Sequence, residues 1–269
     1  IVSALPLVTF SGLDTAYCLD AVAVTLTGVP LGGIFTGPGI AGNSFDPAAA
    51  GVGTHSINYA YSDGNGCSND STKLVTVNAL PVVTFTGLNA TYCIDDAAAV
   101  LVGSPLGGTF SGTGVSGGTF VPSVADTGSH TVTYVYTDGN GCTGSQVQGT
   151  VVTPLPVVSF SGLSAAYCVS AATETLTGSP IGGTFSGPGI TSNVFDPGAA
   201  GAGNHSIVYV YSDGGGCTDS LLQSVVVNPL PAVTFSGLDS SYCVDASPTN
   251  LVGFIPGGTF TGTGVTGSS

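Results

Sequence analysis

Short runs in which apolar and polar residues alternate dominate the chain, and this period of two predicts β-strands and no helices. β-Branched and aromatic side chains occupy most of the apolar positions, which is typical of strands. Glycine- and proline-rich turns separate the runs, and the segment 63–66 (Asp-Gly-Asn-Gly) has the composition of a hairpin turn. About six or seven short antiparallel strands are predicted in the first 79 residues. They centre on Val8–Phe10, Val24–Leu26, Ile34, Phe45, Ile57–Tyr61 and Val75–Val77.

The same pattern recurs along the chain with a constant step of 75 residues and no insertions. The segment LPLVTFSGLDTAYC, which begins at Leu5, returns in closely similar form at Leu80, Leu155 and Leu230. A fixed period of this kind is the signature of a tandem array. We therefore divide the chain into the end of a preceding repeat (residues 1–4), repeat 1 (5–79), repeat 2 (80–154), repeat 3 (155–229) and a partial repeat 4 (230–269).

Each repeat is expected to form a small, all-β, antiparallel Ig-like β-sandwich, because turns punctuate it about every eight to twelve residues. A sandwich of this size has a thin core and buries only about 60% of its unfolded surface, so a covalent staple would stabilise it. The connections between repeats (78–81, 153–156 and 228–231) contain one or two prolines each. Such short, extended connections predict a rod-like array of sandwich repeats.

Composition excludes several classes of function. One basic residue, Lys73, stands against fifteen acidic ones, and the net charge of -14 leaves no positive surface for nucleic acid or anionic lipid. With 42% apolar and only 6% charged residues, the chain is expected to fold. No apolar run approaches the roughly 18 residues that span a bilayer, so membrane insertion is not expected. The absence of methionine and of a signal peptide predicts an internal piece or a processed product.

The titratable residues lack the grouping that catalysis or metal binding requires. His55, His130 and His205 occur once per repeat, and we interpret them as structural. The run that begins at Asp63 superficially resembles a calcium loop, but Cys67 takes its fifth position and no glutamate closes it, which excludes an EF-hand. Neither a phosphate-binding loop nor a nucleophile elbow occurs. We therefore expect no enzyme and no cofactor, with calcium at domain junctions as the alternative.

Other recurring residues fit turns and packing. Asp63, Asp138 and Asp213 open the hairpin turn, where an aspartate caps its own backbone. The tyrosines at 59 and 61, like their equivalents in repeats 2 and 3, share one strand face and are expected in the core. The alternative for these tyrosines is an exposed platform on which sugars stack.

The seven cysteines fall in two series with the same step, 18, 93, 168, 243 and 67, 142, 217. Regular pairs outside the cytosol indicate disulfides, which we expect at Cys18, Cys67, Cys93, Cys142, Cys168 and Cys217. Three registers respect the repeat: Cys18 with Cys67 inside a repeat, Cys67 with Cys93 across a junction, and Cys18 with Cys142 together with Cys93 with Cys217. In a standard Ig topology the first-strand turn and the final hairpin lie at opposite poles, which favours the third. We nevertheless predict the first, because a thin core most needs its own staple, worth about 4 kcal/mol.

The succession LPxVTFSGL, YC, GSPxGGTFSGPG and FDPxAAGxGxHxIxYxYSDGxGC resembles the tandem Ig-like repeats of very large cell-surface and secreted proteins of the Bacteroidetes. These include gliding-motility adhesins of the SprB type and other substrates of the type IX secretion system. The resemblance covers all four repeats and implies a cell-surface or extracellular, outer-membrane-associated location. It also implies O-glycosylation at Thr15, Ser71 and Ser220, each of which follows an aspartate in the pattern that Bacteroidetes modify.

The repeated residues are mostly turn glycines, corner prolines, cysteines and alternating apolar positions, all of which folding explains. We therefore expect a structural stalk or filament segment of a large bacterial adhesin, which holds an adhesive region away from the cell. A surface or glycan target would contact regions outside this segment. The rods are also expected to associate laterally with one another. The alternative is that the repeats are themselves weak glycan- or surface-binding modules, whose affinity multiplies by repetition.

Overall fold

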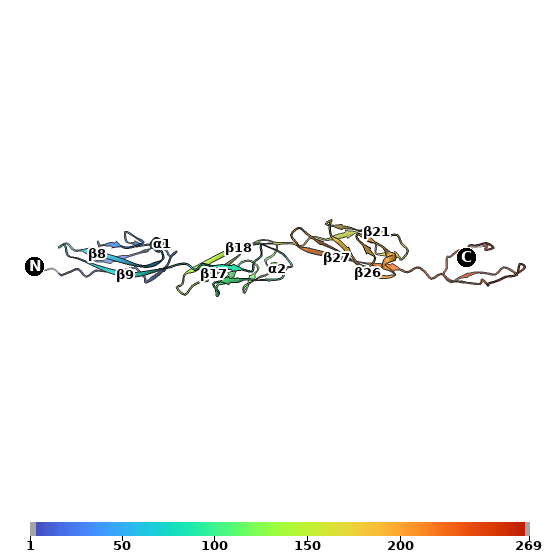
Figure 1. Ribbon diagram of the computed structural model, residues 1–269, viewed down its shortest axis with the longest axis horizontal. Coiled ribbons are helices and arrows are strands. Elements are labelled where there is room, and N and C mark those ends of the chain that lie inside the picture. The colour runs from blue at the N-terminus through green and yellow to red at the C-terminus, as the bar shows by residue number, and fades with distance from the viewer. Residues whose placement is uncertain (1–3, 267–269) are drawn as a thin grey trace. The chain divides into compact units, whose positions relative to one another are not determined.

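A computed structural model describes residues 4–266, so residues 1–3 of the predicted preceding repeat lie outside it. The chain forms two compact units, residues 1–155 and residues 156–269 (Figure 1). The first unit contains repeats 1 and 2, and the second contains repeat 3 and the partial repeat 4. Each unit is described by itself.

Repeat 1 is built almost entirely of strands, and the two longest form a hairpin. Its apolar residues alternate as predicted, so that Ile57 and Tyr59 on one long strand and Val75 and Val77 on the other are buried. The elements are β1 (Thr9–Ser11), β2 (Ala16–Cys18), β3 (Val24–Thr25), β4 (Thr27–Val29), β5 (Ile34–Thr36), β6 (Ile40–Ala41), β7 (Ser44–Phe45), α1 (Pro47–Ala50), β8 (Gly53–Ser62) and β9 (Ser68–Asn78).

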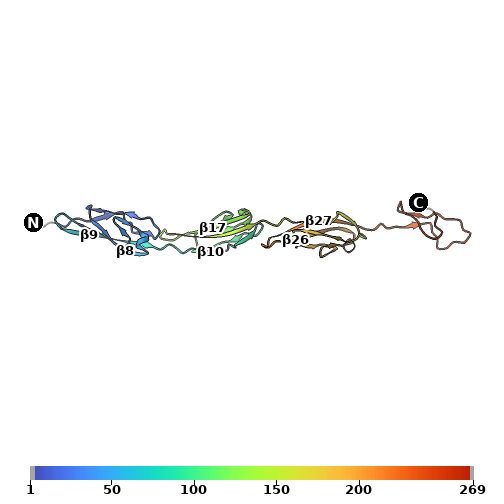
Figure 2. The same cartoon turned by 90° about the horizontal axis from the view of Figure 1, so that it is seen from above.

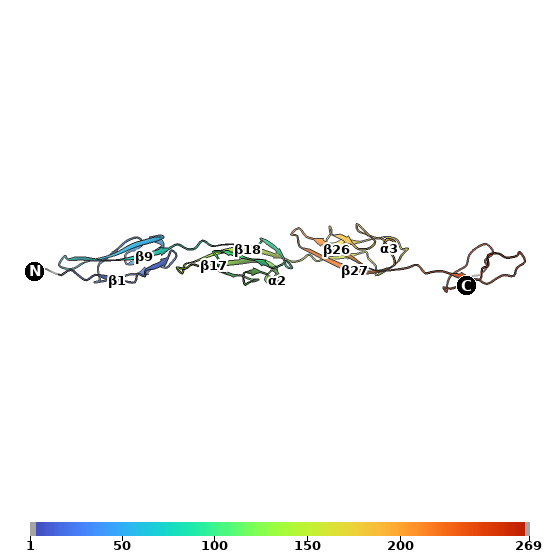
Figure 3. The ribbon, with the colours of Figure 1, turned by 60° about the horizontal axis from the view of Figure 1, so that its bottom comes forward.

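Two layers enclose one core in repeat 1. One layer is a four-stranded sheet with the order β2-β9-β8-β5, and the other consists of the pair β1-β4 and the sheet β3-β7-β6. Phe10 from β1 and Phe45 from β7 pack with Ile57 and Tyr59 from β8 in a single buried cluster. Figure 2 shows the long β8-β9 hairpin, and Figure 3 shows β1 running beside it. The predicted all-β sandwich is confirmed.

One strand pair departs from the antiparallel arrangement. β2 runs parallel to the end of β9, with Ala16 opposite Thr76 and Cys18 opposite Asn78. Gly12 lies between β1 and β2 with a φ of 90°, and a Cβ there would lie 2.3 Å from the carbonyl oxygen of Thr25. This glycine lets the chain leave one layer and continue along the edge of the other without reversing, and so it joins the last strand in parallel.

Repeats 2 and 3 have the same order of elements, which confirms the tandem Ig-like array. Repeat 2 contains β10 (Thr84–Thr86), β11 (Thr91–Cys93), β12 (Ala99–Val100), β13 (Val102–Ser104), β14 (Thr109–Ser111), β15 (Val115–Ser116), β16 (Thr119–Phe120), α2 (Pro122–Ala125), β17 (Gly128–Thr137) and β18 (Thr143–Thr153). Repeat 3 contains β19 (Ser159–Ser161), β20 (Ala166–Cys168), β21 (Glu174–Thr175), β22 (Thr177–Ser179), β23 (Thr184–Ser186), β24 (Ile190–Thr191), β25 (Val194–Phe195), α3 (Pro197–Ala200), β26 (Gly203–Ser212) and β27 (Thr218–Asn228). Residues 230–266 form only β28 (Phe235–Ser236) and β29 (Val252–Gly253).

A buried tyrosine on the first long strand organises each core. Tyr59 is 2% exposed, and its ring centroid lies 4.5 Å from that of Phe35. Its hydroxyl donates to the carbonyl of Pro30, 2.5 Å away, and accepts the N–H of Gly33. Tyr134 and Tyr209 make the same bonds in repeats 2 and 3. The predicted core role is confirmed for Tyr59, Tyr134 and Tyr209, whereas Tyr61 is half-buried and packs against the cluster of repeat 1.

In the part of the chain that the structure describes, three single-turn helices interrupt the strands, although the period-two pattern predicted none. In α1 the side chain of Asp46 caps the first turn by accepting the N–H of Ala48, and Pro47 takes the first helical position. A four-residue helix is too short to show an apolar stripe, so only its cap and proline indicate it in the sequence. Among residues 4–266, no helix has the length and apolar character to cross a membrane.

Candidate functional site

A cystine joins two successive repeats of the first unit. Cys18 is the last residue of β2 in repeat 1, and Cys142 lies in the turn between β17 and β18 of repeat 2. Their sulfurs are 2.04 Å apart and their Cα atoms 5.5 Å apart, across a sequence separation of 124 residues. Cys142 is fully buried and Cys18 is half-buried. The bond fixes the far end of repeat 1 to the hairpin of repeat 2.

The predicted pairing of Cys18 with Cys67 inside repeat 1 is wrong, because the two residues lie at opposite ends of β9. Cys18 is opposite Asn78, the last residue of β9, whereas Cys67 immediately precedes Ser68, the first. At about 3.3 Å per residue, an 11-residue strand separates them by more than about 30 Å. A disulfide requires a Cα separation of no more than about 6.8 Å. The sequence signal for the correct register, Cys18 with Cys142, was therefore that the first-strand turn and the final hairpin of an Ig-like domain lie at opposite ends.

The other cysteines fall into two groups. Cys93 and Cys217, the equivalents of Cys18 and Cys142, are disulfide-bonded. Cys67, Cys168 and Cys243 have free thiols, so the prediction of disulfides at Cys67 and Cys168 is not met within these residues. Counting the Cys18–Cys142 separation back from Cys67, or forward from Cys168, gives positions outside the 269 residues.

The hairpin turn positions the cysteine that it presents. In repeat 2, the carboxylate of Asp138 accepts the N–H groups of Asn140 and Cys142, each at 2.9 Å. Asp63 makes the same bonds in repeat 1, and its pKa is lowered mainly by the hydrogen bond from the N–H of Cys67. In repeat 3, the carboxylate of Asp213 accepts the N–H groups of Gly215 and Cys217. The predicted turn-capping role of these aspartates is confirmed, and the cap fixes the backbone of each hairpin cysteine.

The histidines support the fold. The Nε2 atom of His55 donates to the carbonyl of Gly51, 2.7 Å away, and Gly51 is the residue that caps the C-terminal end of α1. His130 and His205 make the equivalent bonds to Asp126 and Gly201, both at 2.8 Å. Since one nitrogen of each ring is engaged with the backbone, the structural interpretation of these residues is confirmed.

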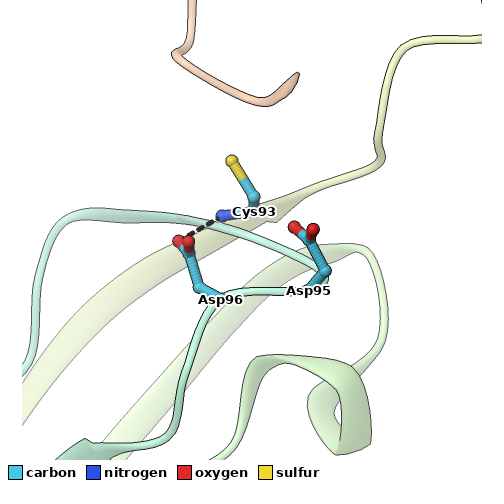
Figure 4. Close-up of side chains that lie close together, drawn as sticks. All are labelled: Cys93, Asp95 and Asp96. Carbon is cyan, nitrogen blue, oxygen red and sulfur yellow. Dashed lines mark hydrogen bonds between the residues drawn. The ribbon is translucent and has the colours of Figure 1, made fainter. Parts of the chain in front are cut away.

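One group of three potential metal ligands occurs within residues 4–266, at Cys93, Asp95 and Asp96 (Figure 4). Cys93 is disulfide-bonded, so its sulfur is not available as a thiolate ligand. Its N–H donates to the Asp96 carboxylate at 2.7 Å, and both carboxylates are exposed. Repeat 3 has Ser170 and Ala171 at the equivalent positions. The group therefore consists of two solvated carboxylates beside a cystine.

A shallow hollow recurs beside the core tyrosine of repeats 2 and 3. Its volume is about 410 Å³ in repeat 2 and about 540 Å³ in repeat 3. Leu106 and Ile181 occupy the same place on its rim and are 79% and 90% exposed. The tyrosine hydroxyl at its base is already bonded within the fold. Glycines and aliphatic and aromatic side chains line both hollows, together with Thr109 in repeat 2 and with Thr177, Thr184, Ser192 and Asn193 in repeat 3.

The predicted O-glycosylation residues lie on the surface to different degrees. Thr15 and Ser220 are exposed, and Ser71 is half-buried on β9 opposite Tyr59. Two of the three hydroxyls are therefore accessible to a modifying enzyme. Glycosylation stays a prediction.

Comparison with known proteins does not place the chain in a family: no family model matches it, and no curated protein matches it significantly. A solved Ca2+-stabilized adhesin that helps an Antarctic bacterium reach out and bind ice is 15% identical, with 89% of this chain and 79% of that chain covered and a TM-score of 0.33. A 1.5-MDa bacterial ice-binding adhesin is 12% identical, with coverage of 85% and 99% and a TM-score of 0.31. A tetra-tandem repeat from the extending region of a large adhesion protein is 13% identical, with coverage of 86% and 76% and a TM-score of 0.25. At these sequence identities and TM-scores, the description of the fold and the site depends on this chain's own residues.

Proposed function

We propose that this chain is a stalk segment of an extracellular adhesin, whose repeats hold an adhesive region away from the cell. The Cys18–Cys142 cystine is the observation that carries the proposal. It connects one repeat to the next instead of closing a loop within a repeat. The bond therefore holds neighbouring repeats of the array together. A bond in this position restrains the junction that a stalk must keep from folding back.

The disulfides and the internal hydrogen bonds of the recurring polar residues support this role. Disulfides form and persist in oxidising compartments, which favours a secreted or surface-displayed chain. The recurring histidines, aspartates and tyrosines are each engaged within the fold. These residues therefore support structure, and we propose a chain without enzymatic activity.

The finer assignment rests on the resemblance of the repeats to those of Bacteroidetes surface proteins. On that basis we propose attachment at the outer membrane of such a bacterium, in a gliding or related adhesin. Immunogold labelling of intact cells with an antibody to this segment tests the location. Labelling confined to the cytoplasm would contradict it.

We also propose that the fold is independent of calcium, since Asp95 and Asp96 are exposed and repeat 3 has no equivalent carboxylates. The measurement is the thermal unfolding temperature with excess calcium and with a chelator. The two temperatures are expected to agree. A chelator-induced fall that Asp95→Asn and Asp96→Asn abolish would instead establish a calcium site there.

The second candidate function is weak multivalent binding by the repeats, which the recurring hollow with exposed Leu106 and Ile181 favours. Repetition would raise the avidity of individually weak contacts. The test uses beads coated at graded density with the chain or with its matched Leu106→Asp, Ile181→Asp variant. The retention of these beads on a glycan array and on bare surfaces distinguishes the two functions. The stalk predicts equally low retention of both kinds of bead. Retention that rises with density and is lost in the variant would replace the stalk by a binding array.

The reach of the chain is the direct test of the stalk. Three long hairpins placed in series would span at least about 100 Å at the rise of a β-strand. Small-angle X-ray scattering of the oxidised chain should therefore give a maximum dimension above that value. A smaller dimension, with the repeats folded back on one another, would contradict the stalk.

A further inference from the structure

We propose that the Cys18–Cys142 cystine carries tension past the folded segments that it encloses, and so limits how far the chain extends under load. The inference rests on the proposed function only in that a stalk is pulled along its length. The bond and its place in the chain come from the structure alone.

The cystine encloses nearly all of the two repeats. Strands β3 to β9, the junction 78–81 and strands β10 to β17 lie between its cysteines in sequence. Only β1 and β2 precede Cys18 in repeat 1, and only β18 follows Cys142 in repeat 2. A pull applied at the two ends of the unit therefore has a covalent path through the bond that bypasses the enclosed strands. The enclosed strands are loaded only through their pairing with β1, β2 and β18.

The parallel pairing of β2 makes this covalent route short. β1 and β2 lead from the start of repeat 1 to its far end, because Cys18 lies beside Asn78, where β9 ends. The disulfide then leads to the hairpin of repeat 2, and β18 runs from that hairpin to Thr153 at the end of the repeat. The route thus crosses each repeat once, along one edge or hairpin strand. The peptide connection at 78–81 stays out of the loaded path.

The amount of chain held back follows from the sequence separation. An extended chain spans at most about 3.6 Å per residue, so 124 residues correspond to about 450 Å. Strands outside the loop can still be peeled away, and the enclosed strands can lose their hydrogen bonds. The enclosed residues cannot add to the length while the S–S bond is intact.

Thiol exchange is the expected way to release this length. A thiolate that attacks Sγ of Cys18 forms a mixed disulfide and frees the thiolate of Cys142. The second thiol of a dithiol reagent then displaces Cys18, and the reagent leaves as a cyclic disulfide, having supplied two electrons. Cys142 is fully buried and Cys18 only half-buried, so Cys18 is the more accessible of the two residues.

The test is single-molecule stretching of the full 269-residue chain, held by its two ends. Because Cys93 and Cys217 are also disulfide-bonded, the starting chain carries serine at Cys67, Cys93, Cys168, Cys217 and Cys243, which leaves one cystine. A non-reducing peptide map first verifies the Cys18–Cys142 bond in it. The matched chain carries Cys142→Ser in addition. As a control, Cys67→Ser alone in the natural chain should leave the extended length unchanged.

The matched chain should extend about 450 Å further than the starting chain when both are fully unfolded. Dithiothreitol added to a stretched molecule of the starting chain should produce the same gain in one step. This second measurement compares a molecule with itself, so it does not depend on how well the variant folds. Equal final lengths, with no step on reduction, would overturn the proposal. Failure of the stalk would appear instead as density-dependent bead retention, with the 450 Å step intact.

Discussion

Repeat 3 and the partial repeat 4 begin with nearly the same residues, yet they bury them to very different extents. The opening is LPVVSFSGL in repeat 3 and LPAVTFSGL in repeat 4. Phe160 is 7% exposed in the first, whereas its equivalent Phe235 is 52% exposed in the second. Repeat 3 has the long β26-β27 hairpin, and residues 230–266 form only the short pair β28-β29. The part of repeat 3 that follows β24, which contains β25, α3 and the long hairpin, therefore completes the core more than the opening strands do.

Local structure survives without the hairpin. The hydroxyl of Tyr242 accepts the N–H of Asp239 at 2.8 Å, as the hydroxyl of Tyr167 accepts that of Ser164. Gly237 keeps a φ of 94°, and a Cβ there would lie 2.1 Å from the carbonyl oxygen of Asn250. These contacts join residues close in sequence. The comparison therefore separates turn geometry, which forms locally, from burial, which the hairpin supplies.

The largest effect is expected from removing the tyrosine that the hairpin inserts into the core. Tyr209→Ala should destabilise repeat 3 by about 4 kcal/mol, because it leaves a cavity beside Phe185. Tyr209→Phe keeps the ring and loses only the bonds to Pro180 and Gly183, for about 1–2 kcal/mol. Hydrogen exchange of the β26 and β27 amides measures both. Equal exchange in the two variants would show that the ring does not organise the core.

The next effect compares one substitution at two equivalent glycines. A Cβ at Gly178 would lie 2.1 Å from the ring of Tyr209, whereas at Gly253 the nearest atoms are 3.7 Å away. Gly178→Ala should therefore cost about 1–3 kcal/mol through overpacking. Gly253→Ala should change stability by less than about 0.5 kcal/mol. Hydrogen exchange in each repeat provides the readout, and a comparable loss from both substitutions would contradict the comparison.

The smallest effect concerns the turn that closes the hairpin of repeat 1. The pKa of Asp63 lies below its usual 3.8, mainly because its carboxylate accepts the N–H of Cys67. A lowered folded-state pKa contributes stability above the unfolded pKa and loses it as the pH falls through the folded value. Protection of the Cys67 amide should therefore fall below about pH 4, and Asp63→Asn should remove this pH dependence. An NMR titration that places the pKa at or above 3.8 would contradict the expectation.

The sequence alone identified the strands, turns and repeats because each depends on neighbouring residues. The alternation in 57–61 and 75–77 predicted the buried faces of β8 and β9, and the turn at 63–66 predicted the hairpin between them. The same local reasoning assigned the capping role of Asp63. These features recur in repeats 2 and 3 because their turn and strand sequences recur.

Equivalent positions can nevertheless make different long-range contacts. The amino group of Lys73 lies 4.9 Å from the ring centroid of Phe10, whereas Gln148 in the same position donates to the carbonyl of Phe85 at 2.8 Å. Both side chains connect the last strand to the first, but a cation favours the ring face and an amide favours a carbonyl. The charge of Lys73 in the sequence did not reveal this packing role.

Only the tertiary structure decided where the two cysteines of a repeat lie relative to each other. Their spacing along the chain is compatible with all three registers, and the need of a thin core for a staple favoured the wrong one. The parallel pairing of β2 with the end of β9 places Cys18 a full strand length from Cys67 and beside the next repeat. Sequence periodicity specifies which residues are equivalent, whereas the direction of a strand depends on partners some 60 residues away.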